Sequence, residues 1–247
     1  MKAEEGPQVR SEAKGSEKPD EAGKDAGHAA LAWLHSARFL TTASRLDQLP
    51  APGRPEIAFV GRSNAGKSTA INTLAQHKRL AFSSRTPGRT QHINLFEVGP
   101  KDGADALLAD LPGYGYAAVE RSAKLRWQRV MADYLRERPS LAGVVLLADA
   151  RLGLTELDRR LLELIAPRLA GGAVRLLVLL TKADKLNRRD SQHALEHCEQ
   201  VLAAYADEDA EIGVSLFSAL SRQGLDDVAE ALHEWRETGG APPEAAA

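Results

Sequence analysis

Nine residues of the chain form a candidate phosphate-binding loop. The stretch GRSNAGKST follows a predicted strand, precedes a predicted helix and matches the pattern G-x-x-x-x-G-K-S/T. Its two glycines let backbone N–H groups approach phosphates closely. Lys67 brings a cation to the terminal phosphates, and Ser68 offers a hydroxyl to Mg²⁺. The predicted nucleotide-binding residues of this loop are Gly61, Arg62, Ser63, Asn64, Ala65, Gly66, Lys67, Ser68 and Thr69.

A second motif indicates which base is bound. The tetrapeptide TKAD begins at Thr181, at the end of a predicted strand, where doubly wound sheets bind their ligands. Asp184 can accept hydrogen bonds from both the ring N–H and the exocyclic amine of guanine, which adenine cannot donate. Lys182 would lay its aliphatic stem across the base, and the backbone of Ser218 and Ala219 could contact it. These residues predict selectivity for GTP and GDP.

The segments between these motifs contain candidate contacts to Mg²⁺ and to the γ-phosphate. Asp110 ends a strand and fits a carboxylate on the Mg²⁺ side, and Gly113 can donate its N–H to the γ-phosphate. The polar loop 83–91 contains Thr90, whose hydroxyl is predicted to meet Mg²⁺, although Thr86 competes for that role. The predicted metal ligands are Ser68, Thr90 and Asp110, and Gly88 joins the nucleotide-binding residues.

Composition sets limits on the class of protein. The 247 residues include 32 basic and 34 acidic ones, for a net charge of −2, which argues neither for nor against nucleic acid. A single cysteine excludes an intramolecular disulfide and fits a reducing compartment. No apolar run reaches the length of a signal peptide or of a membrane span. We therefore expect a cytoplasmic protein with no membrane contact.

Alternating strands and helices predict an α/β fold. Residues 1–27 are charged and small and are predicted to be disordered, as is the tail 239–247. The range 28–238 forms one predicted domain, which opens with a helical stretch from 29 to 49. Six strands are expected at 56–60, 93–98, 106–110, 143–149, 175–181 and 212–217, and helices at about 67–77, 120–138, 155–170, 190–206 and 225–237. The connection between the second and third strands is too short for a helical crossover, so these two strands must form an antiparallel hairpin. The prediction is a three-layer P-loop NTPase G domain with a mostly parallel six-stranded sheet.

These motifs together resemble the EngB family of bacterial GTPases, also called YihA or YsxC. The resemblance runs from about residue 38 to 235 and rests on six stretches: EIAFVGRSNAGKST, TPGRTQHINLFEV, DLPGYGYA, KLRWQRVMADYL, LLTKADKL and FSAL. It implies a single G domain, GTP or GDP with Mg²⁺, and a role in assembling the large ribosomal subunit. It says nothing about the leader 1–27. A monomer is expected.

Tyr114 raises a question about hydrolysis. It stands where many nucleotide hydrolases have a residue that orients the attacking water, and a phenol replaces a polar amide poorly. The resemblance suggests that Asn64 helps to hold K⁺ beside the phosphates; Gln91 or an arginine at 85 or 89 are alternatives. The predicted catalytic residues are Lys67, Asn64, Thr90 and Gly113. We expect slow GTP hydrolysis, and the rival hypotheses are an ATP-using kinase and a nucleotide-binding module without turnover.

Positive charge is concentrated in one segment of the chain. Residues 78–138 contain eleven basic and seven acidic side chains, an excess of +4 that leaves −6 for the remainder. A basic surface of this kind suits contact with a phosphate backbone. The precursor of the large ribosomal subunit as the partner follows from the resemblance, not from the charge.

Overall fold

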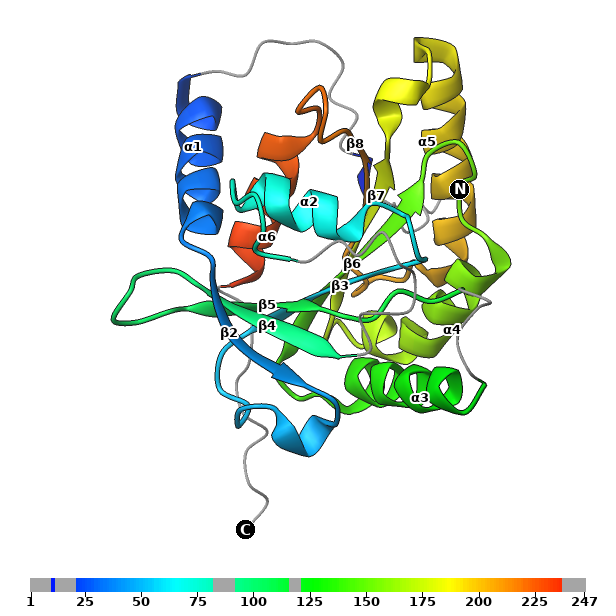
Figure 1. The fold of residues 1–247 in the computed structure, drawn as a ribbon. Helices are drawn as coiled ribbons and strands as arrows, with labels where there is room; N and C mark the ends of the chain where they lie inside the picture. The colour runs from blue at the N-terminus through cyan, green and yellow to red at the C-terminus, as the bar shows by residue number, and fades with distance from the viewer. Residues whose placement is uncertain (1–9, 12–20, 82–91, 116–120, 237–247) are drawn as a thin grey trace.

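The structure, a computed structural model, describes residues 10–11, 21–81, 92–115 and 121–236. Its helices and strands largely alternate along the chain, and the strands form one central sheet (Figure 1). The strands are β1 (Arg10–Ser11), β2 (Arg38–Ala43), β3 (Glu56–Gly61), β4 (Ile93–Val98), β5 (Ala106–Asp110), β6 (Leu141–Asp149), β7 (Arg175–Thr181) and β8 (Ile212–Phe217). The α-helices are α1 (Glu21–His35), α2 (Lys67–Leu74), α3 (Arg121–Glu137), α4 (Glu156–Ala170), α5 (Arg188–Leu202) and α6 (Leu225–Trp235). Single turns of 3₁₀ helix lie at Leu46–Gln48, Ala183–Lys185 and Ala203–Tyr205.

The sheet has the strand order β1-β8-β7-β6-β3-β5-β4-β2. In this order, neighbouring strands from β1 through β8, β7, β6 and β3 to β5 pair in parallel, whereas β5–β4 and β4–β2 are antiparallel. All six predicted strands are present as β3 to β8, and the short connection between β4 and β5 makes the expected hairpin. Every residue of β6 is buried, which explains why its sequence reads as one continuous apolar run.

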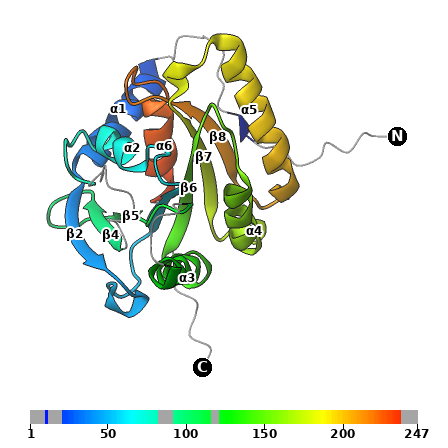
Figure 2. The same cartoon turned by 45° about the vertical axis from the view of Figure 1, so that its right-hand side comes forward.

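Helices cover both faces of the sheet, and each covered face has its own core. One face carries α1, α2 and α6, and the other carries α3, α4 and α5 (Figures 1 and 2). Neighbouring residues of β3 alternate between the two cores: Phe59 belongs to the first and Val60 to the second. The predicted three-layer α/β fold is therefore confirmed. Among the described helices, none is long and apolar enough to cross a membrane.

The N-terminal region differs from the prediction. The expected helical stretch 29–49 ends as a helix at His35, and Arg38–Ala43 is an edge strand that pairs antiparallel with β4. Its sequence RFLTTA contains two threonines and a phenylalanine, which favour strands, and β4 offers it a free edge. With this strand and β1, the sheet has eight strands instead of six. The leader was also predicted to be disordered throughout, yet β1 lies within it and α1 begins at Glu21.

The topology brings the candidate site together at one edge of the sheet. Strands β3, β5, β6 and β7 are mutually parallel, so their carboxyl ends meet there. Those ends are Gly61, Asp110, Asp149 and Thr181, and three of these four were predicted as site residues from the sequence. This edge is where open α/β sheets bind ligands.

Candidate functional site

The predicted phosphate-binding loop connects the end of β3 to the start of α2. A Cβ atom added at Gly61 would lie 2.7 Å from the carbonyl oxygen of Leu147 in β6, so only glycine fits there. Gly66 has a φ of 97° and caps α2, whose first residue is Lys67. The loop therefore leads directly into the amino-terminal end of α2, whose positive dipole favours an anion.

Lys67 and Asp110 form an ion pair at the mouth of this loop. The lysine nitrogen contacts Oδ1 of Asp110, and the exposed fractions of the two side chains are 10% and 1%. The second oxygen, Oδ2, is buried and has no hydrogen-bond partner within the described structure. A buried carboxylate oxygen in this state is costly unless it receives a ligand. The residues predicted to bind the phosphates and the metal therefore lie together, and Oδ2 of Asp110 is available to accept a ligand.

This arrangement fits Mg²⁺ that arrives with a nucleotide. The hydroxyl of Ser68 and the free oxygen of Asp110 are the hard oxygen donors that Mg²⁺ prefers. The described residues contain no cluster of three or more His, Cys, Asp or Glu that could hold a metal ion. Phosphate oxygens and water, with Thr90 as predicted, would supply the other ligands, which is usual for Mg²⁺ at nucleotide sites.

A pocket of about 490 Å³ lies where the base and ribose are expected. Its lining includes Gly66, Thr69, Lys182, Asp184 and Ala219, all predicted nucleotide-binding residues. Exposed Leu220 also lines it and was not among the predicted site residues.

The carboxylate of Asp184 is held in place at this pocket. Its Oδ1 accepts a hydrogen bond of 2.7 Å from Oγ of Ser218, a residue that is fully buried. This bond, aided by nearby Lys185, lowers the pKa of Asp184. Only backbone contacts of Ser218 were predicted from the sequence, whereas its side chain orients the predicted guanine-reading carboxylate. The ionised form can accept the two N–H donors of guanine.

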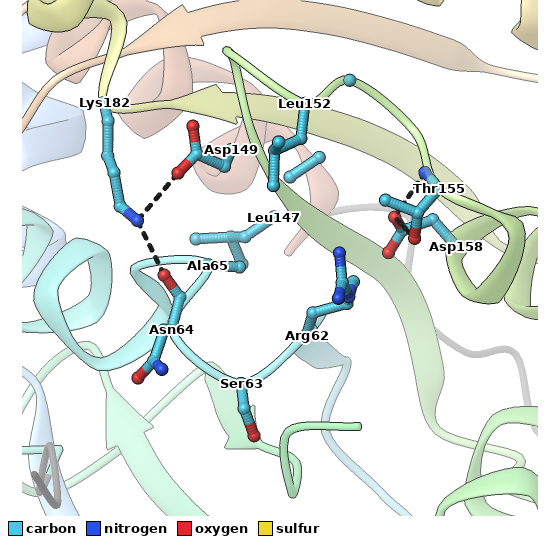
Figure 3. A pocket seen from close by; sticks show the side chains of 12 residues that line it. Arg62, Ser63, Asn64, Ala65, Leu147, Asp149, Leu152, Thr155, Asp158 and Lys182 are labelled. Carbon is cyan, nitrogen blue, oxygen red and sulfur yellow. Dashed lines mark hydrogen bonds and ion pairs between the residues drawn. The ribbon is translucent and has the colours of Figure 1, made fainter. Parts of the chain in front are cut away.

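Two neighbours in the TKAD motif tie the base-binding segment to the phosphate-binding loop. Lys182 Nζ lies 2.8 Å from the carbonyl oxygen of Asn64 and 2.9 Å from Oδ2 of Asp149 (Figure 3). Thr181 Oγ1 donates to the carbonyl oxygen of Ala65 over 2.6 Å. Asp149 was not predicted as a site residue, although it is the last residue of its strand, as Asp110 is. The two motifs, far apart in sequence, thus form one rigid unit.

Tyr114 does not face the phosphate site. Its side chain is only 4% exposed and packs in the core on the side of α3, α4 and α5. Its hydroxyl donates a 2.6 Å hydrogen bond to Oδ1 of Asp158 in α4. Burial, reinforced by the Asp158 carboxylate, raises the pKa of this phenol well above its ordinary value. The side chain is therefore a structural anchor in this structure and does not orient a water molecule.

Arg62 and Ser63 lie beside this anchor, between the phosphate-binding loop and α4. Together with Asn64, Asp158 and Lys182 they line a second pocket, of about 150 Å³, behind the loop (Figure 3). A Cβ atom added at Gly113 would lie 3.3 Å from both N and Oγ of Ser63. Gly113 thus lies against the phosphate-binding loop, and its N–H contact with the γ-phosphate stays a prediction.

Several predicted residues cannot be placed. Gly88 and Thr90, with Thr86, Gln91 and the arginines at 85 and 89, lie outside the described residues. The prediction of a basic surface over residues 78–138 is wrong at one position, because Arg138 is only 7% exposed and pairs with buried Glu56. Arg138 therefore cannot belong to a surface that contacts a partner.

Comparisons with known proteins give consistent results. Residues 56–182 match the protein family described as "50S ribosome-binding GTPase". The chain is 59% identical over 205 residues to the probable GTP-binding protein EngB of Acidovorax ebreus, covering 83% of this chain and 90% of that protein. It is 52% identical over 216 residues to the EngB of Burkholderia thailandensis, covering 87% and 97%.

Solved structures share the fold. A crystal structure of a probable GTP-binding protein engB superposes with a TM-score of 0.54 and 18% identity, covering 74% of this chain and 99% of that one. A variant of Era from Aquifex aeolicus, bound to GDP and AlF4⁻, gives a TM-score of 0.57 and 19% identity, covering 73% and 56%. At these identities the likeness confirms the predicted G-domain architecture.

Proposed function

The chain belongs to the EngB family of GTP-binding proteins, and on that premise we propose that it is a slow GTPase that acts as a nucleotide switch in assembly of the large ribosomal subunit. The observation that supports nucleotide chemistry is the Lys67–Asp110 ion pair at the phosphate-binding loop, in which one carboxylate oxygen of Asp110 has no hydrogen-bond partner in the described structure. Phosphoryl transfer depends mainly on positioning and on neutralising charge, and this pair supplies both.

GTP binding would rearrange this pair. The ammonium of Lys67 would exchange Asp110 for the terminal phosphates, and the Asp110 carboxylate, with the Ser68 hydroxyl, would then face the Mg²⁺ side of the nucleotide. Mg²⁺, when bound, neutralises charge on the β- and γ-phosphates. Thr90, a predicted third ligand, lies outside the described residues. Binding of GTP should therefore weaken strongly when Mg²⁺ is chelated.

Base selectivity is assigned to Asp184, held by Ser218. Asp184→Asn should shift preference from guanine to xanthine nucleotides, because xanthine presents a carbonyl where guanine presents its amine. Competition by GTP, XTP and ATP against a labelled GDP analogue measures this preference. Equal affinity of the unaltered protein for ATP and GTP would favour the rival hypothesis of an ATP-using kinase.

Hydrolysis without partners should be slow, roughly 10⁻⁴ s⁻¹, as in unassisted G domains. The support is the buried side chain of Tyr114, which leaves no described residue at the position that usually orients water. The same observation favours a second candidate, a nucleotide-binding module without turnover. A single-turnover measurement separates the two, because the module would release no phosphate beyond the uncatalysed rate.

K⁺ is proposed as the missing assistance. The Asn64 carbonyl oxygen is taken by Lys182, while its side-chain amide points away from the pocket behind the loop (Figure 3). Replacing Na⁺ with K⁺ should accelerate hydrolysis, and Asn64→Ala should abolish the difference. Because Asn64 has a φ of 69°, Asn64→Gly is the better-matched variant: it removes the amide without straining the backbone. Equal rates in both salts for the unaltered protein would contradict the proposal.

The proposed partner is the precursor of the large ribosomal subunit, bound in the GTP state through the basic segment 78–138. In support, the matching family is described as ribosome-binding, and Lys78, Arg79, Lys101, Arg129 and Arg136 are exposed. Such contacts release counterions, so affinity should fall with a log–log slope of about 0.7–0.9 for each phosphate neutralised.

Sedimentation with purified large subunits tests this docking. Reversing Lys124, Arg126 and Arg129 of α3 to glutamate should weaken binding and flatten the salt dependence, with nucleotide affinity unchanged. Reversing three arginines outside the segment, Arg160, Arg188 and Arg189, is the matched control for net charge. Equal sedimentation with GDP and with a non-hydrolysable GTP analogue would contradict control by the nucleotide.

A further inference from the structure

The three residues Gly113, Tyr114 and Gly115 are clamped from several sides. The backbone of Tyr114 bridges the phosphate-binding loop, because its N–H donates to the carbonyl of Gly61 over 3.3 Å and its carbonyl accepts from the N–H of Ser63 over 2.9 Å. Gly115 has a φ of 83°, and a Cβ atom there would lie 3.1 Å from Cδ1 of Leu157 in α4. A larger residue at either glycine would require its neighbours to move by a few tenths of an ångström, and at Gly115 the positive φ would add backbone strain.

Asp158 holds this segment from behind. It is 1% exposed, and each of its carboxylate oxygens has its own donor. Oδ1 accepts from the Tyr114 hydroxyl over 2.6 Å, whereas Oδ2 accepts from the N–H and the hydroxyl of Thr155 over 2.7 Å and 2.6 Å. Hydrogen bonds to an ionised group are stronger than neutral ones, and burial strengthens them further. Asp158 therefore joins Tyr114 firmly to the first turn of α4.

The turn before α4 is itself fixed to the phosphate-binding loop. At its start, Asp149 pairs with Arg151 over 2.7 Å and with Lys182, which also reaches the carbonyl oxygen of Asn64. At its end, Thr155 and Asp158 form the capping box of α4. Figure 3 shows these two attachments on opposite sides of the pocket behind the loop. The anchor of Tyr114 thus belongs to the same frame as the loop.

We propose that Tyr114 and Asp158 are positioning residues, which hold Gly113 so that its N–H meets the γ-phosphate without prior rearrangement. The inference rests on the proposed GTPase function, because the γ-phosphate contact of Gly113 belongs to that proposal. In this proposal neither side chain contacts the nucleotide. Their hydrogen bond acts through the backbone of Tyr114, which adjoins Gly113 and is hydrogen-bonded to Gly61 and Ser63 of the loop.

The test compares two buried tyrosines. Tyr114→Phe removes the bond to Asp158, and the matched control Tyr134→Phe removes a bond from an equally buried tyrosine to Glu56, at the other end of the sheet. Affinities for GDP and for a non-hydrolysable GTP analogue are measured for each. We expect Tyr114→Phe to lower analogue affinity by about tenfold, the scale of one lost charge-assisted bond, and GDP affinity by less than about twofold. Tyr134→Phe should leave the ratio of the two affinities unchanged.

A second pair of variants guards against a folding defect. Asp158→Asn retains an oxygen that can accept from Tyr114, so its ratio should lie between those of the unaltered protein and Asp158→Ala. The proposal is overturned if Tyr114→Phe leaves the ratio unchanged, or if both tyrosine variants shift it equally. If the unaltered protein binds no GTP, the proposed function fails, and this inference fails with it; binding with an unshifted ratio overturns the inference alone.

Discussion

Two buried ion pairs lie at opposite ends of the central strands, and they differ in how fully their carboxylates are used. At the amino end of β3, both oxygens of Glu56 are occupied by Arg138, one of them also by Tyr134 and the other by Ser140. At the carboxyl end of β5, Asp110 has a single partner, Lys67, and one oxygen without any in the described structure. The first pair is complete, whereas the second is available for a ligand.

This difference separates a structural ion pair from a candidate ligand site. The guanidinium of Arg138 is planar and bonds Glu56 through two nitrogens, and it also donates to the carbonyl oxygen of Pro50 over 2.8 Å. The ammonium of Lys67 is a point charge on a flexible stem, so it can exchange one anion for another at little cost. Both pairs are buried, so burial alone would not have distinguished the two.

The largest expected effect is on stability at the complete pair. Glu56→Gln keeps the shape of the side chain but leaves Arg138 buried without its counter-charge, which should cost about 3–5 kcal/mol of unfolding free energy. Urea unfolding at pH 7 measures this loss, and labelling of Cys198, the only cysteine of the chain, reports on it independently. Burial raises the pKa of that thiol to about 12, so it should react only when the fold opens.

A double variant is the control for this prediction. Glu56→Leu combined with Arg138→Met replaces the pair by apolar groups and should recover most of the lost stability. A loss below about 1 kcal/mol in Glu56→Gln would remove the distinction drawn between the two pairs.

The matched change at the open pair should act on binding. Asp110→Asn should cost less stability than Glu56→Gln, because it removes one contact to an ammonium on a flexible stem, whereas Glu56→Gln disturbs a network with Arg138, Tyr134 and Ser140. Affinity for the Mg²⁺ complex of a GTP analogue should fall at least about tenfold, since an amide is a weaker donor to Mg²⁺ than a carboxylate. Titration calorimetry with and without Mg²⁺ measures this. If both amide variants weaken stability and binding alike, the two pairs are equivalent and the comparison fails.

The smallest effect is expected at Asp149, which is intermediate between these two pairs. Arg151, and to a lesser extent Lys182, lower the pKa of its carboxyl well below the ordinary value. Because the folded-state pKa is depressed, the stability gained is present above the unfolded pKa of about 3.9 and is lost as the pH falls further. Arg151 is half exposed, so Arg151→Gln should cost under about 1 kcal/mol at pH 6.

The pH dependence is the distinguishing result for this variant. The stability difference between the unaltered protein and Arg151→Gln should be constant above about pH 4 and should shrink as the pH falls below the unfolded-state pKa of about 3.9, as measured by urea unfolding. A difference that stays constant as the pH falls below this value would mean that Arg151 stabilises the turn by packing and not by charge.

Much of the site was predictable because its signals are local. The phosphate-binding loop, the TKAD motif and the alternating strands depend on neighbouring residues and on backbone conformation, for which spacing within a few positions is sufficient. Gly61 and Gly66 are examples, since each is required by a turn or a close approach that the pattern itself implies. The strand ends then follow from parallel pairing, which places Asp110 and Thr181 at one edge.

The tertiary structure decided what depends on partners far along the chain. Arg38–Ala43 forms a strand because it pairs with the edge of β4. Arg138 is buried, and so is not part of the basic surface, because it pairs with Glu56, which is 82 positions away in the sequence. The direction of Tyr114 was decided by Asp158, 44 positions later. A sequence pattern records which groups a residue could use, but burial and the nearest available partner determine which one it does use. For that reason the sequence could predict which residues would bind the nucleotide, whereas the structure was needed to show that the tyrosine beside them is an anchor.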